Sequence, residues 1–192
     1  MRKLFALCGL ALVALLSVGS PAAANHKFQC ESVQSGVTVR DVLVPRGASC
    51  SLIDSTVTGN VYVSRDAFLE AQNTDISGEV HADDALGVFL DTGTTVGRSV
   101  RIHRTAEVFV FNTTVERDLE VDRAGQVVQV CGTTIEHGDL ELERSGTDLL
   151  IGDPLAVGCP GNTVSGDIEI ERNFTDVEFV VRGNTVGADL EV

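Results

Sequence analysis

Basic residues are scarce in this sequence of 192 residues. The chain contains 14 lysine and arginine residues against 28 aspartate and glutamate residues. Nucleic acids and anionic membrane surfaces bind proteins through clusters of positive charge. The composition therefore argues against both as partners, and it favours cations or cationic surfaces.

The sequence has a single long hydrophobic run, which lies near its N-terminus. Arg2 and Lys3 precede the run from Leu4 to Val18, and three alanines at positions 22–24 follow it. Such a run is short for a bilayer span but suits a secretory signal peptide. We therefore expect a signal peptide over residues 1–24, no membrane span, and a secreted, extracellular domain over residues 25–192. That domain has 12 basic and 28 acidic residues.

Helical periodicity is absent, and a short phrase of alternating apolar residues recurs instead. Its eight copies are 19, 19, 20, 19, 21, 28 and 22 residues apart. A period of this size is typical of a solenoid, in which each repeat buries its apolar side by stacking on its neighbours. The copies are Val42-Leu43-Val44, Val61-Tyr62-Val63, Val80-His81-Ala82, Val100-Arg101-Ile102, Leu119-Glu120-Val121, Leu140-Glu141-Leu142, Ile168-Glu169-Ile170 and Leu190-Glu191-Val192.

The clearest unit, residues 163–171, shows how one coil is expected to form. Ile168 and Ile170 alternate with acidic residues, as in a strand with one buried face. Gly166 precedes the strand, and we expect it to allow a turn with positive φ, as at the matching Gly59 and Gly78. A second strand follows each unit, and stacking then creates apolar columns, one of which begins with Phe89 over Phe109. The sequence predicts an all-β protein, a single-stranded right-handed parallel β-helix of seven to eight coils.

The unit Thr163-Val164-Ser165-Gly166-Asp167-Ile168-Glu169-Ile170 resembles the repeats of known right-handed parallel β-helices. The similarity is greatest to bactofilin-like and small secreted bacterial β-helix repeats, within the wider class that includes pectate-lyase-like solenoids. It covers residues 37–192 and implies a fold rather than a function. Bactofilins are cytoplasmic polymers without signal peptides. The polysaccharide-cleaving β-helices are longer and have large loops, whereas this chain has one insertion, residues 152–162, which we expect to be a surface loop.

Four cysteines remain after the expected signal peptide, and their spacing follows the repeat. Cys30 and Cys50 are 20 residues apart across a 19-residue step, and Cys131 and Cys159 are 28 apart across the 28-residue step. Each pair therefore falls on adjacent coils, within reach of a disulfide. We expect the disulfides Cys30–Cys50 and Cys131–Cys159. Zinc is a poor alternative, because no CxxC motif occurs and no histidine lies near either pair.

Carboxylates recur at the outward strand positions in the C-terminal half. They are expected to stack at the strand spacing of roughly 4.8 Å, where like charges repel. Calcium, which takes several oxygen ligands, is a candidate to bridge neighbouring coils. The candidate ligands are Asp118, Glu120, Asp139, Glu141, Asp167 and Glu169. The alternative is a solvated face partly neutralised by a column of arginines, namely Arg104, Arg123, Arg144 and Arg172, and charges on such a face also oppose aggregation.

Two smaller patterns could carry a function, a histidine–aspartate cluster and a threonine column. His81, Asp83 and His103 are expected to lie together, but no nucleophile or oxyanion donor accompanies them, so chance surface histidines are the simpler interpretation. A threonine column interrupted by Asp75 suggests an ice-binding array, but such arrays need two columns and only Thr56-Val57-Thr58 fits. No catalytic motif is present.

These observations favour a secreted, non-enzymatic β-helix with a structural or binding role at the cell surface or in the extracellular matrix. The alternatives are a carbohydrate-active β-helix, a polysaccharide lyase or hydrolase, and a calcium-dependent adhesion module. We expect no cofactor other than possible calcium ions, and a surface or polysaccharide as partner. The protein is expected to be a monomer, or a weak homodimer that pairs through its C-terminal ends when cations screen the carboxylates.

Overall fold

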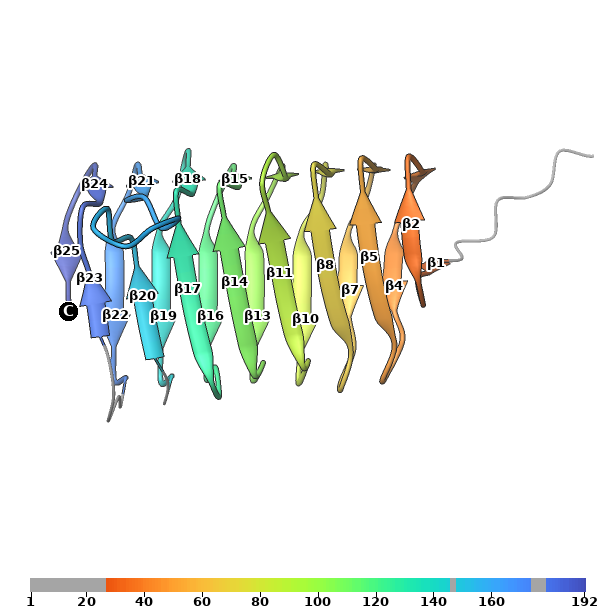
Figure 1. The fold of residues 1–192 in the computed structure, drawn as a ribbon, viewed down its shortest axis with the longest axis horizontal. Helices are drawn as coiled ribbons and strands as arrows, with labels where there is room; N and C mark the ends of the chain where they lie inside the picture. The colour runs from red at the N-terminus through yellow and green to blue at the C-terminus, as the bar shows by residue number, and fades with distance from the viewer. Residues whose placement is uncertain (1–26, 146–147, 174–178) are drawn as a thin grey trace, which may run out of the picture.

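The computed structural model describes residues 27–145, 148–173 and 179–192, and all their regular structure is β. The strands stack as a parallel β-solenoid of about eight turns, whose rungs follow one another along the long axis of the molecule (Figure 1). Three parallel sheets run the length of the solenoid. The repeat therefore forms the fold that its period predicts.

Sheet A consists of the repeated phrase itself and one additional strand before it. Its nine strands, in spatial order, are β1 (Phe28–Gln29), β4 (Val42–Val44), β7 (Val61–Val63), β10 (Val80–Asp83), β13 (Val100–His103), β16 (Leu119–Asp122), β19 (Leu140–Glu143), β22 (Ile168–Glu171) and β25 (Leu190–Glu191). Because β1 pairs with β4, the solenoid begins before residue 37, where the sequence resemblance starts.

Sheets B and C complete each coil, with eight strands each. Sheet B contains β2 (Val33–Ser35), β5 (Ser49–Ile53), β8 (Phe68–Gln72), β11 (Gly87–Asp91), β14 (Glu107–Phe111), β17 (Val127–Cys131), β20 (Asp148–Ile151) and β23 (Phe179–Val181). Sheet C contains β3 (Thr38–Val39), β6 (Thr56–Val57), β9 (Asp75–Ile76), β12 (Thr95–Val96), β15 (Thr114–Val115), β18 (Thr134–Ile135), β21 (Thr163–Val164) and β24 (Thr185–Val186).

The core lies between the three sheets and consists of stacked aliphatic side chains. Along β22, Ile168 is fully buried whereas Glu169 is only half-buried, so the predicted alternation is confirmed. The strand register stacks like positions on like, for example Leu140 on Ile168 and Ile135 on Val164. Each coil thus closes the apolar surface of the coil before it.

The glycines that precede some of the sheet A strands have a different role from the predicted one. Gly166, Gly59 and Gly78 do not have positive φ. A Cβ on Gly166 would instead collide with the carboxylate of Asp139 from the preceding coil. The positive φ values lie at the corners of the coils instead. Between sheets A and B the arginine column adopts them, with φ of 50° at Arg104 and 55° at Arg172. Between sheets B and C they occur at Asp54, Asn73 and Asn112.

The phenylalanine column lies on the outer face of sheet B and not in the core. Phe89 pairs with Phe109 in register, as predicted, but both point out of sheet B and are partly exposed. The inward neighbours Val88 and Val108 form the core column in their place. With Phe68, the rings form an external stack with centroid separations of 4.8 and 4.4 Å.

Buried polar side chains from successive coils form a ladder of hydrogen bonds inside the corner between sheets B and C. The hydroxyl of Thr133 donates to the carbonyl of Val110 at 3.1 Å, and Nδ2 of Asn162 donates to the carbonyl of Val130 at 2.8 Å. Both side chains are almost fully buried. They satisfy backbone groups that the turn would otherwise leave without partners. The repeat pattern alone did not predict this ladder.

Both predicted disulfides are confirmed. Cys30–Cys50 lies in the core with its Cα atoms 5.3 Å apart, near the first corner of the solenoid. Cys131–Cys159 joins the end of β17 to the inserted loop, with Cα atoms 4.7 Å apart. The loop lies between β20 and β21 and crosses the outer side of sheet B (Figure 1). It is the surface loop that the insertion predicts.

Candidate functional site

The outer face of sheet A changes character halfway along the solenoid. The middle outward position of each strand forms one column in register. Its first five members are neutral, aromatic or basic, and its last four are all glutamate: Gln29, Leu43, Tyr62, His81, Arg101, Glu120, Glu141, Glu169 and Glu191. We call the last four the glutamate column. The carboxylate stacking that the sequence predicts is therefore present.

The charges of the glutamate column are poorly compensated. Arg101 pairs with Glu120 at 3.1 Å, at the start of the column. Within the described residues, no ion pair reaches Glu141 or Glu169. Burial and the neighbouring Glu120 and Glu169 raise the pKa of Glu141. Desolvation and the neighbouring Glu191 likewise raise the pKa of Glu169. Each charge in the middle of the column is therefore disfavoured by its surroundings.

The adjacent aspartate column has a structural role that the sequence did not reveal. Oδ1 of Asp139 accepts the backbone N–H of Asp167 at 2.7 Å, and Oδ1 of Asp167 accepts that of Asp189 at 2.6 Å. Asp41 and Asn60 do the same in the first coils, at 3.0 and 2.9 Å. An outward carboxylate thus caps the strand of the next coil, which leaves it less free to bind a ligand.

The six predicted calcium ligands therefore divide into two groups. Asp118, Asp139 and Asp167 belong to the aspartate column, and Glu120, Glu141 and Glu169 belong to the glutamate column. Over the ranges that the structure describes, no three acidic, histidine or cysteine side chains are grouped as a metal site requires. The calcium site stays a prediction.

The arginine column at the corner forms a ladder of ion pairs with the acidic residues beside it. Nε of Arg104 lies 2.6 Å from Oδ1 of Asp84, and Nη2 of Arg65 lies 2.8 Å from Oδ2 of the same residue. These hydrogen bonds, first that of Arg104, lower the pKa of Asp84 to about 2. Further along, burial would raise the pKa of Asp122, but the hydrogen bond from Arg144 lowers it. Arginines thus neutralise the acidic residues at this corner, whereas Glu141 and Glu169 of the glutamate column have no such ion pair among the described residues.

The predicted histidine cluster is also present. Nδ1 of His103 lies 3.0 Å from Oδ1 of Asp83, and Nε2 lies 3.1 Å from Oδ2 of Asp122. His81 is diagonal to them, on the next column. Among the described residues, no hydroxyl or thiol hydrogen-bonds the ring of His103. Its geometry is that of a link between carboxylates on the two coils that flank its own, rather than of a base beside a nucleophile.

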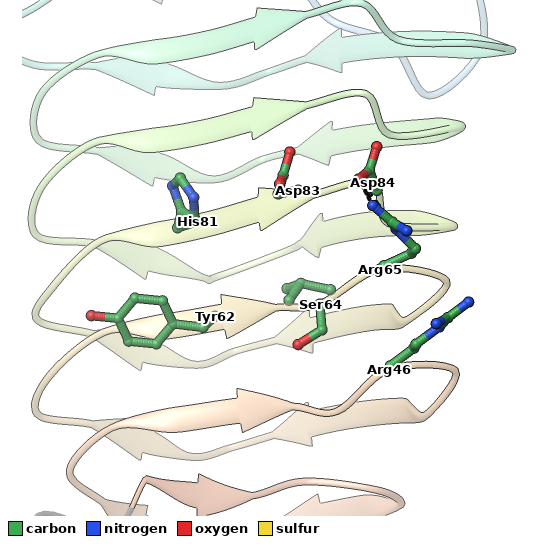
Figure 2. Close-up of a pocket in the computed structure, with 8 residues that line it drawn as sticks. Arg46, Tyr62, Ser64, Arg65, His81, Asp83 and Asp84 are labelled. Carbon is green, nitrogen blue, oxygen red and sulfur yellow. Dashed lines mark hydrogen bonds and ion pairs between the residues drawn. The ribbon is translucent and has the colours of Figure 1, made fainter.

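A shallow hollow of about 410 Å³ lies on the outer side of β7 and β10 and beside the turn after β4, in the half of sheet A that lacks the glutamate column. Figure 2 shows Tyr62 and His81 side by side on neighbouring strands, with the arginines at the corner. Nζ of Lys27 lies 3.3 Å from the centre of the Tyr62 ring. The polar residues that line the hollow are Arg46, Tyr62, Ser64, Arg65, His81, Asp83 and Asp84.

The threonine column is in register as predicted, from Thr38 through Thr56, Asp75 and Thr95 to Thr185. Its neighbour column is not threonine, since the exposed Glu116 and Glu136 follow β15 and β18 at the next outward position after Thr114 and Thr134. The face therefore lacks the second threonine column that an ice-binding surface needs.

Comparison of the chain with protein-family models, with curated proteins and with solved structures finds no match in any of the three. In the part of the chain that is described, no helix is long and apolar enough to cross a membrane. Two disulfides are typical of extracellular proteins. The functional argument therefore rests on the geometry of the solenoid faces.

Proposed function

We propose that this protein is a secreted, non-enzymatic β-helix that binds a cationic partner at the cell surface or in the extracellular matrix. The observation that carries the proposal is the glutamate column. Glu141 and Glu169 lie on adjacent rungs with raised pKa values, and in the described part of the chain no arginine pairs with either. A partner that brings positive charge to this face relieves the repulsion between them.

The scaffold suits such a role because it presents the column on a rigid face. Backbone hydrogen bonds and the aspartate caps fix the spacing of successive coils. The ligand chemistry that fits is a row of amines or guanidinium groups, as in a basic protein segment or a polymer with cationic groups. The expected fold relatives, the bactofilin-like and small secreted bacterial repeats, are compatible with a structural or binding role.

A calorimetric titration with polylysine tests the proposal. We expect binding that weakens with salt, as exposed charges are screened. The double variant Glu141→Gln/Glu169→Gln should bind more weakly by a larger factor than the control Glu31→Gln, which changes an exposed charge near β1. Equal effects from these variants, or no binding by the wild type, would refute the glutamate column as the binding face.

A calcium titration separates the calcium-dependent adhesion alternative from this proposal. If calcium occupies the column as a ligand site, it should bind with measurable heat and the double variant should lose that heat. If the column binds polycations directly, calcium should compete with polylysine only weakly, through screening. Enhancement of polylysine binding by calcium would favour the adhesion module instead.

The hollow around Tyr62 favours a second candidate, the binding of a polysaccharide. An aromatic ring beside serine, histidine and arginine side chains offers both an apolar contact and hydrogen bonds to a sugar. Glycan-array binding that Tyr62→Ala abolishes, and Glu141→Gln does not, would support it. Release of shorter sugars in the same assay would instead support the carbohydrate-active alternative.

A further inference from the structure

The single tyrosine of the chain, Tyr62, is in contact with Lys27, the one lysine that follows the expected signal peptide. Nζ of Lys27 lies over the ring, 3.3 Å from its centre. Lys27 precedes β1, and the strand order β1-β4-β7 means that its side chain reaches across β4 to β7. Because Lys27 is exposed, its ammonium group covers the ring from the solvent side.

The ring of Tyr62 is held in place at the edge of the hollow on β7 and β10. Its hydroxyl accepts a hydrogen bond from Nδ2 of Asn60, two residues earlier, at 2.9 Å. Figure 2 shows the ring face-on, next to His81 on the neighbouring strand. One broad face of the ring is therefore directed outward, as the apolar contact with a sugar requires. Lys27 occupies the face that such a ligand needs.

The contact between Lys27 and Tyr62 is weak enough to be exchanged for a ligand. A cation–π contact at an exposed site stabilises a protein little, because water solvates the ammonium group equally well. Asp41 precedes β4 as Lys27 precedes β1, but it pairs with Arg40 instead. Among the described residues, no carboxylate forms an ion pair with Lys27. The flexible side chain can therefore leave the ring without breaking an ion pair.

The carboxylates that line the hollow are paired, in contrast to Lys27. Asp84 accepts hydrogen bonds from Arg65 at 2.8 Å and from Arg104 at 2.6 Å. Oδ1 of Asp83 lies 2.8 Å from Nη2 of Arg104. These carboxylates are therefore not available to bind the ammonium group of Lys27. A ligand that displaces Lys27 from the ring leaves an uncompensated positive charge at the edge of the site.

We infer that Lys27 is a specificity-determining cover over Tyr62, which selects sugars that carry an anionic group, a carboxylate or a sulfate. The inference rests on the polysaccharide site proposed at this hollow. A neutral sugar must remove Lys27 from the ring and offers the ammonium group no new partner. An anionic sugar replaces the ring contact by an ion pair with the displaced ammonium group. The same lysine therefore weakens the binding of one class of sugar and strengthens that of the other.

The place of the hollow on sheet A is compatible with an anionic ligand. Tyr62 and His81 belong to the half of the outward column that carries no carboxylate, and the glutamate column begins only at Glu120. Arg46 and Arg65 lie at the corner on one side of the hollow. The repulsion from more distant carboxylates is screened over about 8 Å at physiological ionic strength. The charges next to the ring therefore decide which sugars bind.

The displacement of Lys27 can be followed without an added probe. The chain has one tyrosine and no tryptophan, so its fluorescence reports on Tyr62. Acetylation of the mature chain, mapped by mass spectrometry, reports on Lys27 separately from the terminal amine. We expect any sugar that stacks on Tyr62 to change the fluorescence. A neutral sugar should increase the acetylation of Lys27, and an anionic sugar should decrease it. Equal acetylation with the two ligands would overturn the inference.

Titration with matched sugars tests the selection itself. The ligands are a soluble glucan oligosaccharide and its carboxymethylated and sulfated forms, at physiological salt. Lys27→Gln should bind the neutral glucan about two- to fivefold more tightly, the range expected for loss of an exposed cation–π contact, and should bind both anionic forms more weakly by a similar factor. The control Arg117→Gln removes an exposed positive charge before β16, away from the hollow, and should leave all three affinities unchanged.

The outcomes separate this inference from the site on which it rests. If no glucan binds to the wild type or to Lys27→Gln, the polysaccharide site fails, and the selective role of Lys27 fails with it. If the glucans bind through Tyr62 but Lys27→Gln shifts every affinity in one direction, or shifts none, the site stands and the role of Lys27 is overturned. Because Lys27 is exposed, we expect the variant to fold, and circular dichroism checks this.

Discussion

Gly166 lies directly over the carboxylate of Asp139, one coil earlier, and that carboxylate accepts the N–H of the next residue, Asp167, at 2.7 Å. The same relation joins Gly59 to Asp41, whose Oδ1 accepts the N–H of Asn60 at 3.0 Å, and Gly138 likewise lies over the carboxylate of Asp118. The Gly-Asp pair of the repeat is therefore a device for stacking. The glycine leaves room for the aspartate carboxylate of the preceding coil. The aspartate that follows the glycine accepts a backbone N–H of the next coil.

This relation predicts that Gly166→Ala destabilises the solenoid although the φ of Gly166 is an ordinary one. The methyl group would displace the Asp139 carboxylate and its hydrogen bond, at a cost of about 1–3 kcal/mol. Gly125→Ala is the matched control, since its Cβ would meet only the Cα of Ala106 at 3.8 Å. Urea unfolding followed by circular dichroism measures both, and equal stabilities for the two variants would contradict the stacking role.

The glutamate column predicts a stability that rises as the pH falls from neutral into the mildly acidic range. The pKa values of Glu141 and Glu169 are higher in the folded chain than in the unfolded chain. Folding therefore favours proton uptake, and the destabilisation they cause appears as the pH rises through their folded pKa values. Asp84 acts oppositely, because its contribution is lost as the pH falls from about 3.8 toward about 2. We expect the maximum stability between these two ranges.

Calorimetric unfolding at a series of pH values checks this expectation. Glu141→Gln/Glu169→Gln should be more stable than the wild type at neutral pH, and its stability should depend less on pH in the mildly acidic range. Glu31→Gln provides the comparison for a single exposed charge. A wild-type stability that increases steadily toward neutral pH would show that the column is compensated in solution.

The repeat spacing was sufficient to predict sheet A, the cysteine pairs and the loop, because each depends on register alone. It could not place the phenylalanines. Strand β14 reads Glu107-Val108-Phe109-Val110-Phe111, with apolar residues on both faces, so alternation no longer distinguishes inside from outside. The roles of Gly166 and Asp139 were missed for another reason. They depend on contacts between residues a whole coil apart, which local sequence does not show.

The buried polar ladder predicts a large cost for Asn162→Leu. Its side chain accepts the N–H of Thr133 at 2.9 Å and donates to the carbonyl of Val130 at 2.8 Å. Leucine would leave both groups buried without partners, which costs about 2–4 kcal/mol. Thr134→Val, on the outer side of sheet C, changes a half-buried hydroxyl and should be nearly neutral. Urea unfolding that finds similar losses for the two variants would refute the ladder's role.

The two disulfides predict the same effect on stability but different effects on the inserted loop. Each closes a loop of between 20 and 30 residues, so replacing either pair by alanine should cost about 3–4 kcal/mol in the chain-entropy model. Cys30–Cys50 is in the core at one end of the solenoid, whereas Cys131–Cys159 positions the loop that carries Leu155. Only Cys131→Ala/Cys159→Ala should therefore increase amide hydrogen exchange within residues 152–162, because the loop loses its covalent link to β17. Urea unfolding and hydrogen exchange on the same two variants test both statements. If exchange in the loop increases equally in both variants, it follows overall stability, and the disulfide does not hold the loop in place.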